Sequence, residues 1–436
     1  MSNEILGLVA LGSMFVGIFA GFPIAFTLIF LAIIFGWIGL GNLVFHLMTL
    51  QVYSVMRDPI LSAVPFFLFM GYILENSGLM DRLFKSFQMM LAKMAGSLYI
   101  AVVITATIFA AATGIVGSSV TLLGVMAGSN MRASKYDVAL SAGAITAGGT
   151  LGILIPPSVM LVVMGPVVGV PVTDLFTAAF FPGFTLSALY ITYCLVRCWI
   201  NPKLGPALPR EMWPPSVGYV VKEMLIGVLP VTIVIMTTLG TILFGLATPT
   251  EAAAAGSVGS LALTLCYRRM TWAKFKDACF KTLEISSMIL FLVAASNFFG
   301  AVFSRLGSAA WLTDILLSLS VPPTVMLLLI LGLIFVLGWP LEWVPIVLII
   351  VPILLPTVQK MGINMIWFSI LVAVTLQTAW LSPPVALSAY FLKGVVPQWD
   401  LKDIYRGMMQ FMCLQVIGAL LVLFFPQIAL WLPEYL

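Results

Sequence analysis

Charge is scarce in this sequence. Only 8% of its 436 residues are Asp, Glu, Lys or Arg, whereas 62% are hydrophobic, and the mean hydropathy is +1.15. Soluble domains carry about 25% charged residues. A chain so poor in charge predicts a polytopic membrane protein, with room for about a dozen apolar segments of roughly 20 residues. It excludes a nucleic-acid-binding protein, a Rossmann cofactor domain and a secreted module held by disulfides.

Histidine and paired cysteines are also lacking. His46 is the one histidine, and the five cysteines form no C-x-x-C pair. These lacks exclude a histidine metal cluster and a Cys-His catalytic dyad. An intramembrane enzyme would need a catalytic pair or a metal cluster inside the bilayer, and a channel would need a continuous polar lining. The sequence indicates neither, so the protein is predicted not to be an enzyme.

Three apolar stretches are too long or too interrupted to be simple membrane helices. They are 97–130, with TGIVGSSVT at its centre, 136–168, interrupted by IPPS, and 322–357, interrupted by GWPLE. Within hydrocarbon every backbone N–H and C=O must be paired, so a broken helix is tolerated only against protein or a water-filled cavity. The breaks are therefore the candidate functional sites.

The placement of Lys and Arg indicates which stretches cross the membrane. If 97–130 and 322–357 are hairpins that enter and leave on one side, all but Arg57, Arg305 and Lys360 of the 20 basic residues share a side. If both stretches cross instead, the asymmetry is weaker. The basic side is cytoplasmic by the positive-inside rule, so both termini are predicted to be periplasmic.

An internal repeat follows from the same layout. The segments AGGTLGILIPPSVMLVVMGPVVGV (147–170) and VTLQTAWLSPPVALSAYFLKGVV (374–396) align on their Pro-Pro pairs. Each follows a predicted hairpin, and the hairpins open on opposite faces, so the halves are inverted, as in secondary transporters. The predicted fold is an all-α polytopic membrane protein with an inverted repeat, two re-entrant helical hairpins and two Pro-Pro broken helices. Two kinks that arose without symmetry are the alternative.

Each hairpin tip and broken helix would together offer oxygen ligands to a cation. A Pro-Pro step removes two backbone donors and frees carbonyls of the preceding turn, and unwound carbonyls with a few hydroxyls suit Na⁺. The predicted ligands in the first half are Gly114, Gly117, Ser118, Ser119, Gly149, Thr150 and Gly152. Those in the second half are Gly338, Trp339, Gln377, Thr378 and Ser382. Close helix packing is the alternative interpretation of the glycines in GGTLG.

An anionic substrate would lie between the two cation sites, where the N-termini of half-helices point inward. No Lys or Arg lies in the core of either hairpin or broken helix. Helix ends, bound cations and hydroxyl groups would therefore have to hold the anion. The predicted substrate-binding residues are Ser119, Thr121, Ser158 and Thr378. This arrangement predicts cation-coupled transport of an anion.

Two acidic residues at the edges of apolar stretches are candidate proton carriers. Glu251, in ATPTEAAAAG, begins a predicted helix, where the helix dipole also favours an acid. Glu342, in GWPLEW, adjoins the second tip and would either cap the hairpin or tune its cation site. Proton coupling through one of these acids is the alternative to sodium coupling.

An amphipathic helix is predicted over 81–96 at the cytoplasmic interface, because its basic residues lie off its apolar face. The segment 274–281 is expected to be its counterpart in the second half. The predicted division of the chain is scaffold helices (1–80), this arm helix (81–96), a first transport-domain half (97–170), scaffold helices with a second arm (171–281), a second transport-domain half (282–396) and a C-terminal transmembrane helix (397–436).

Several motifs together resemble the large membrane subunit of the tripartite ATP-independent periplasmic (TRAP) transporters. They are AVPFFLFMGYILENSGL (63–79), FAAATGIVGSSVTLLGVMAG (109–128), AGGTLGILIPPS (147–158), LFTAAFFPG (175–183), ATPTEAAAAG (247–256) and the Pro-Pro pair at 383–384. The first-tip motif TGIVGSS looks most like the DctM-like branch for mannitol, chloroaromatic or other small organic acids. In the second half, LSPP stands where many relatives have Thr-Pro-Pro, and Ala379 stands where glycine is frequent.

The resemblance implies sodium-driven symport by an elevator mechanism, in which a transport domain slides against a fixed scaffold and carries two Na⁺ ions. It also implies two partners, a small four-helix membrane subunit and a periplasmic binding protein that delivers an organic carboxylate or sulfonate. The implied location is the bacterial or archaeal inner membrane. A stand-alone cation-coupled or proton-coupled anion transporter without a binding protein is the alternative.

Overall fold

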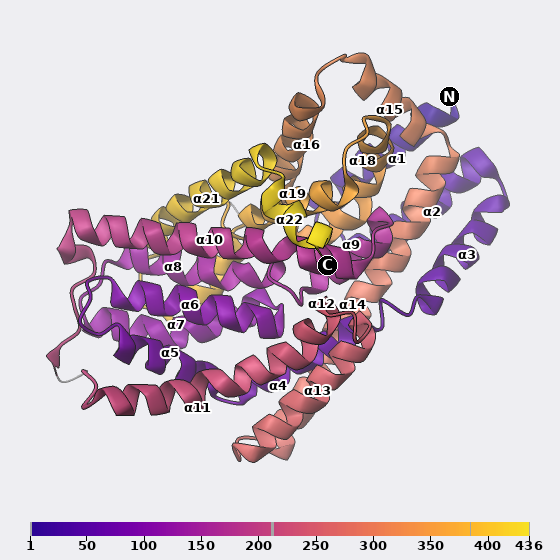
Figure 1. The fold of residues 1–436 in the computed structure, drawn as a ribbon. Helices are drawn as coiled ribbons and strands as arrows, with labels where there is room; N and C mark the ends of the chain where they lie inside the picture. The colour runs from indigo at the N-terminus through magenta and orange to yellow at the C-terminus, as the bar shows by residue number, and fades with distance from the viewer. Residues whose placement is uncertain (1, 211–212, 384, 436) are drawn as a thin grey trace.

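The computed structural model describes residues 2–210, 213–383 and 385–435. These residues form helices joined by short loops, with no strand among them (Figure 1). The predicted all-α class is therefore confirmed. Five described helices are long and apolar enough to cross a membrane, or six if the bent pair α4 (Ala63–Asn76) and α5 (Leu79–Met90) counts as one span.

The other helices fall into two series along the chain. The first series is α1 (Asn3–Phe19), α2 (Ile24–Leu40), α3 (Leu43–Arg57), α6 (Ser97–Thr113), α7 (Val116–Ala133), α8 (Val138–Thr150), η1 (Leu151–Ile153), α9 (Val159–Val168), α10 (Val172–Ile200) and η2 (Pro202–Leu204). The second series is α11 (Val217–Ile235), η4 (Met236–Gly240), α12 (Thr241–Leu243), α13 (Pro249–Cys266), α14 (Trp272–Arg305), α15 (Ser308–Ser318), α16 (Pro323–Gly338), α17 (Trp343–Pro345), η5 (Ile346–Ile350), α18 (Val351–Lys360), α19 (Met365–Gln377), η6 (Thr378–Trp380), α20 (Leu387–Val395), α21 (Leu401–Phe424) and α22 (Gln427–Tyr435).

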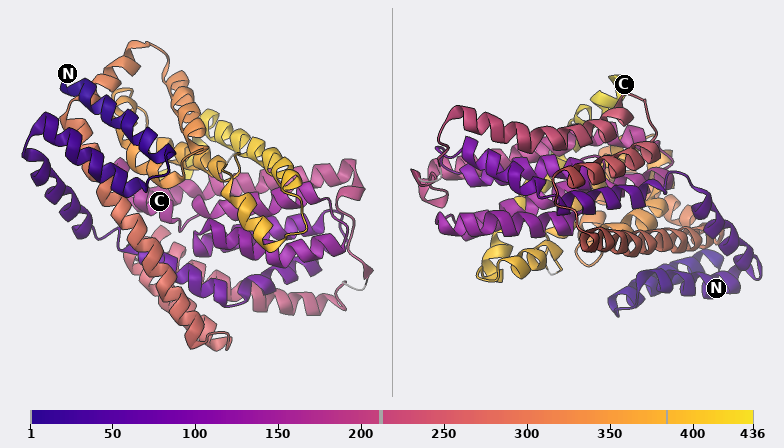
Figure 2. Two further views of the ribbon diagram at one scale, coloured as in Figure 1. Left: turned by 180° about the vertical axis from the view of Figure 1, so that it is seen from behind. Right: turned by 90° about the horizontal axis from the view of Figure 1, so that it is seen from below.

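Two helical hairpins turn back inside the molecule, as predicted (Figures 1 and 2). Helices α6 and α7 meet at Gly114, whose φ of +62° is a left-handed conformation that glycine adopts without strain. In the second half, α16 leads through residues 339–342 into α17, η5 and α18. Each hairpin tip therefore lies among other helices and not at an end of the bundle.

Both broken helices are also present. Helix α8 ends at Thr150, tightens into η1, unwinds through Pro156 and Pro157, and resumes as α9, which the Ser158 hydroxyl caps by accepting from the Leu161 N–H. Helix α19 tightens into η6 in the same way before α20. Of the second predicted Pro-Pro pair, Pro384 lies outside the described residues.

One constant shift along the sequence, the shift that places Pro156 on Pro383, relates the two halves. It carries α8 onto α19, η1 onto η6, and α7 onto the helix Trp343–Lys360, with matching first and last residues. The same shift brings α2 onto α13 and α10 onto α21 to within a few residues at each end. The repeat that the Pro-Pro alignment indicated thus extends well beyond the broken helices.

The arm helix and its counterpart differ from the sequence prediction. The helix predicted over 81–96 spans α5, and the repeat shift relates α5 to α15. The expected counterpart, 274–281, instead forms early turns of the 34-residue helix α14 and corresponds to α3. The cause is local: Pro59 separates α3 from α4, whereas the equivalent Ser286 lets α14 continue.

The C-terminal segment 397–436 holds two helices where one was predicted, because Pro426 lacks the N–H needed to continue α21 into α22. Helix α21 packs on α8 with very close backbone approach. A Cβ on Gly407 would overlap the Ala139 carbonyl oxygen, and a Cβ on Gly143 would overlap the Phe411 ring. Helices α8 and α21 therefore form a tightly packed pair.

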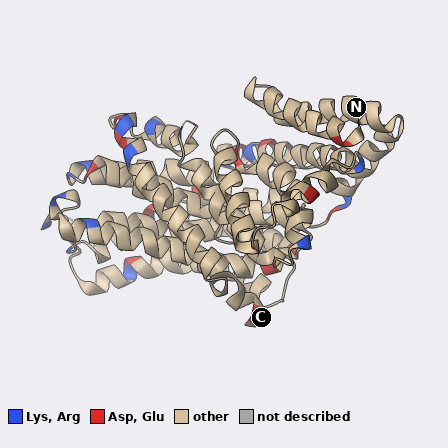
Figure 3. Ribbon diagram, turned by 90° about the horizontal axis from the view of Figure 1, so that it is seen from above, with Lys and Arg blue, Asp and Glu red and all other residues tan. Residues whose placement is uncertain are grey.

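Basic residues gather towards one end of the molecule, and few lie near the opposite end (Figure 3). Two of the three residues expected on the less basic side, Arg305 and Lys360, follow or end α14 and α18, and Lys360 pairs with Asp314 at 3.3 Å. The asymmetry agrees with two hairpins that do not cross the membrane.

Replacement of Gly407 by alanine is expected to separate α21 from α8 and to destabilise the protein by about 1–3 kcal/mol, the usual cost of overpacking. Gly332→Ala, in α16, is a matched control, because a Cβ there meets no atom within 4 Å. It should be neutral or slightly stabilising. Thermal melting of the two purified variants in detergent tests this expectation, and equal melting temperatures would contradict the close packing.

Candidate functional site

Both hairpin tips and both breaks meet around one central cavity of about 140 Å³. The first tip contributes Gly114 to Gly117, and the second contributes Glu342 to Val344. Helices α4 and α14 close the other side. The remaining lining residues are Leu68, Tyr72, Ile153, Val159, Met160, Ile285, Met288, Ile289 and Trp380. The inverted repeat therefore brings its four irregular segments to one place, as the sequence predicted.

The first tip lies directly on the first break. A Cβ on Gly114 would lie 2.8 Å from the Pro157 carbonyl oxygen, and one on Gly152 would lie 3.5 Å from the Gly114 carbonyl carbon. A Cβ on Gly149 would overlap Val120 of α7. Close packing, the alternative interpretation of the GGTLG glycines, is thus present, and it also holds the carbonyl groups of tip and break beside one another.

The predicted hydroxyl ligands mostly donate to backbone carbonyls of their own segments. Ser119 donates to Ile115, Thr121 to Gly117, Ser158 to Ile153, Thr150 to Ala147, Thr378 to Thr375 and Ser382 to Thr378. Ser118 instead lies beside the Glu75 carboxylate of α4. A hydroxyl whose proton is committed in this way still presents lone pairs, so such a group is able to accept or to bind a cation but not to donate to an anion.

The second break differs from the first in its polar groups. Gln377 is fully buried, and neither its amide oxygen nor its amide nitrogen has a hydrogen-bond partner among the described residues. Gly338 faces Ala379, where a glycine Cβ would lie 3.2 Å from the alanine Cβ. Trp339 is 38% exposed and packs edge-on against Phe335. Only Gln377 among these residues presents unpaired polar atoms beside the break.

The two candidate acids occupy very different places. Glu251 forms a capping box with Thr248 at the start of α13: its carboxylate accepts from the Thr248 N–H at 2.8 Å, and its own N–H donates to the Thr248 hydroxyl at 3.3 Å. That geometry supports a structural role. Glu342 lines the central cavity and makes no side-chain cap hydrogen bond to α17. Its carboxylate therefore belongs to the cavity and not to the helix end.

No Lys or Arg lines the described part of the cavity wall. Among the described residues that contact the cavity wall, Tyr72 has a cation over its ring, the Lys281 ammonium at 6.0 Å from the ring centroid. Lys281 is already paired with Asp277 at 2.9 Å. The cavity thus contains one carboxylate and no fixed positive charge, which favours a bound cation over a bare anion.

Two buried polar residues behind the first break were missed by sequence reasoning. Gln415 of α21 is fully buried and donates from its amide nitrogen to the Thr150 hydroxyl at 3.1 Å. The hydroxyl of Tyr190, on α10, lies beside both residues. A glutamine inside the apolar stretch 408–432 was the available signal, because polar side chains in membrane segments are costly and tend to be functional.

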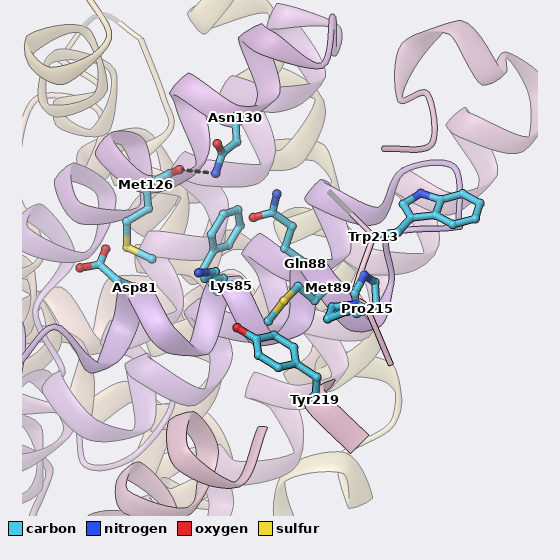
Figure 4. Close-up of a pocket in the computed structure, with 11 residues that line it drawn as sticks. Asp81, Lys85, Gln88, Met89, Met126, Asn130, Trp213, Pro215 and Tyr219 are labelled. Atoms are coloured by element: carbon cyan, nitrogen blue, oxygen red, sulfur yellow. Dashed lines mark hydrogen bonds between the residues drawn. The ribbon is translucent and has the colours of Figure 1, made fainter. Parts of the chain in front are cut away.

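A larger cavity, of about 660 Å³, lies away from the tips and breaks (Figure 4). Its walls come from α5, α7 and the segment 213–219, and they present Asp81, Lys85 and Trp213. Asn130 donates from its side-chain amide to the Met126 carbonyl at its edge. None of the predicted site residues lines it, so the smaller central cavity is the candidate site.

The sequence matches the family model described as "Tripartite ATP-independent periplasmic transporter, DctM component" over residues 11–428. It is 29% identical to the sialic acid TRAP transporter large permease protein SiaM of Vibrio cholerae, over 96% of both chains. It is 29% identical to the C4-dicarboxylate TRAP transporter large permease protein DctM of Pseudomonas aeruginosa, over 89% of this chain and 90% of that protein. It is 27% identical to the 2,3-diketo-L-gulonate TRAP transporter large permease protein YiaN of Escherichia coli, over 96% of both.

The fold is similar to that of the Alcanivorax borkumensis YdaH transporter. The TM-score is 0.65 at 15% sequence identity, over 97% of this chain and 98% of the other. This likeness confirms the predicted fold class of a membrane transporter. The relatives named above differ in the compound that their names give, so the predicted branch for mannitol, chloroaromatic or small organic acids stays a prediction.

Gly114→Ala is expected to destabilise the protein more than Gly362→Ala. Both glycines have left-handed φ, +62° and +68°, so each variant pays a similar backbone cost of about 1–2 kcal/mol. Only at Gly114 does the new Cβ approach another backbone atom, the Pro157 oxygen at 2.8 Å, whereas Gly362 has open space. Melting temperatures measured side by side report the difference, and equal losses would show that the tip does not press on the break.

Proposed function

The chain belongs to the DctM-component family of the tripartite ATP-independent periplasmic transporters, and from that premise we propose sodium-driven, elevator-type uptake of a small organic anion. The family makes the protein a large permease and a secondary transporter, not an enzyme, with several membrane passes in the bacterial inner membrane. The observation that carries the proposal is the single cavity in which both tips and both breaks meet beside Glu342.

Family membership implies two partners, a small membrane subunit and a periplasmic binding protein. We propose that the small subunit is a separate four-helix protein. The chain matches 67% of the longer sialic acid TRAP transporter permease protein SiaT of Haemophilus influenzae, and the remainder of that protein has room for such a subunit. The stand-alone transporter without a binding protein is accordingly the weaker alternative.

Sodium coupling is supported by the chemistry of the cavity. An anion that enters it meets the Glu342 carboxylate and no fixed cation, so it would be repelled unless bound cations supplied positive charge. Oxygen atoms free to bind a cation are available at each break, from the carbonyls beside Gly114 and Pro157 and from the Gln377 amide. Two Na⁺ ions, one at each break, would neutralise the cavity and attract the anion.

The elevator mechanism is supported by how the cavity is walled. Tips and breaks pack on one another at backbone distance, whereas α14 faces the cavity with the apolar side chains of Ile285, Met288 and Ile289. Apolar side chains that form no hydrogen bonds across the cavity would let the transport helices slide past α14 at low cost. The substrate would move with the tips and breaks.

The substrate is proposed to be a small organic carboxylate, with a sulfonate as the related alternative. The relatives are named for sialic acid, C4-dicarboxylates and 2,3-diketo-L-gulonate, and all three are organic acids. The cavity of about 140 Å³ suits a compact anion. The binding protein would contribute much of the selectivity.

The protein is expected to melt at a higher temperature in sodium chloride than in potassium or choline chloride at equal ionic strength. A ligand that binds only the folded state stabilises it by RT ln(1 + [L]/Kd), about 2.7 kcal/mol at a hundred times Kd. The sodium increment should be lost in Gly114→Ala, which displaces the first tip, and retained in Gly362→Ala. Identical melting of the unmodified protein in all three salts would refute sodium coupling and favour a proton.

Removal of the cavity carboxylate is expected to weaken sodium binding. Glu342→Gln keeps the side-chain size and should raise the half-saturating sodium concentration about tenfold, or about 1.4 kcal/mol, as expected for a nearby carboxylate in a partly buried site. Glu251→Gln, at the capping box, should leave it unchanged. A Glu342 variant with unaltered sodium dependence would place the cation sites away from the second tip.

A further inference from the structure

We propose that Gln415 and Tyr190 are positioning residues that hold the end of α8 at the first break and thereby set the sodium affinity of that site. The inference rests on the proposed sodium coupling and deepens it. Neither residue lines the central cavity, so each would act through Thr150, the last residue of α8.

Thr150 is held between its own helix and α21. Its hydroxyl donates to the Ala147 carbonyl at 2.8 Å and accepts from the Gln415 amide nitrogen at 3.1 Å. Both side chains are fully buried. Thr150 immediately precedes Leu151 and Gly152, where the helix tightens and then breaks against the first tip. A shift of Thr150 would therefore move the carbonyl groups offered at the break.

Helix α21 is suited to fix this position because it cannot drift relative to α8. Gly407 and Gly143 bring the two backbones into close contact two turns before Gln415 and Thr150. The contact at Thr150 thus continues a rigid helix pair up to the first residue of the break. A lone hydrogen bond between mobile helices would have no such effect.

Polar atoms left unpaired at this point argue against a purely structural role. The Gln415 amide oxygen and the Tyr190 hydroxyl are buried and have no hydrogen-bond partner among the described residues. An unpaired buried polar atom costs free energy, and a leucine would pack there without that cost. Retained cost at a helix break is expected where the polar groups serve the site.

The same two helices provide a contrasting pair one turn away. Tyr193 donates to the Gln410 amide oxygen at 2.8 Å, and Arg197 completes that cluster by donating to the Tyr193 hydroxyl at 2.6 Å. Phe411 contacts both tyrosine rings, with centroids 5.5 Å apart in each case. The Tyr193–Gln410 pair is fully bonded and lies away from the break, so it is a matched structural control.

The second half supplies its buried amide differently. The repeat shift relates Thr150 to Gln377, which itself carries the amide at the end of α19. At the first break the amide comes from α21, and at the second it comes from the broken helix. Each break therefore has one buried glutamine amide at the same position, although the sequence places them on non-equivalent helices.

The test is a sodium titration of the melting temperature of the full chain, with choline chloride maintaining ionic strength. Gln415→Leu should raise the half-saturating sodium concentration by roughly tenfold or more, as loss of groups that orient a metal ligand commonly does. Gln410→Leu should lower the melting temperature in every salt and leave the half-saturating concentration unchanged. Thr150→Val should weaken sodium binding as Gln415→Leu does, and the double variant should be no weaker than either single one.

Tyr190→Phe, with Tyr193→Phe as its control, removes only a hydroxyl and keeps the test decisive if Gln415→Leu does not fold. An equal loss of melting temperature in all salts for the Gln415 and Gln410 variants, with unchanged sodium dependence, would overturn the positioning role while leaving sodium coupling intact. A sodium-independent unmodified protein would overturn both.

Discussion

Every unusual feature of this structure follows from the requirement that backbone polar groups be paired where no water is present. An unbroken helix satisfies that requirement alone, and a broken one does not. The Pro-Pro step at 156–157 therefore has to be covered by protein, and the tip at Gly114 covers it, at a distance that only glycine allows. The hairpin exists because the break exists, and together they create oxygen-rich backbone inside an apolar bundle.

The same constraint explains why glycine and hydroxyl residues gather at the site. Glycine at positions 114, 149 and 152 brings tip and break within backbone contact. The hydroxyls of Ser119, Thr150 and Ser382 each donate to a carbonyl of the preceding turn, which relieves part of the pairing deficit. Carbonyls that remain free are then available to a cation, so structural need and cation binding use the same groups.

Much of this was predictable because the constraint leaves marks in sequence. Pro-Pro pairs, a glycine-rich centre in a long apolar stretch and one-sided Lys and Arg predicted the hairpins, the breaks and the inverted repeat. The true counterpart of α5 was missed, since it depends on whether a proline such as Pro59 interrupts one copy of a repeated helix. The Gln415 contact was missed because it joins α8 to a helix remote in sequence, which no local pattern records.

The two halves share a fold but differ in charge, and that difference gives the proposed cycle an order. The repeat shift places Glu342 at the second tip where the first tip has Ile115. A carboxylate in a cavity without Lys or Arg attracts a cation and repels an anion. Cation binding at the second tip would therefore precede anion binding, and the anion would complete a neutral or nearly neutral cavity. A neutral cavity crosses hydrocarbon at far lower cost than a charged one, so loaded transport helices would move more readily than partly loaded ones, and coupling would follow from electrostatics alone.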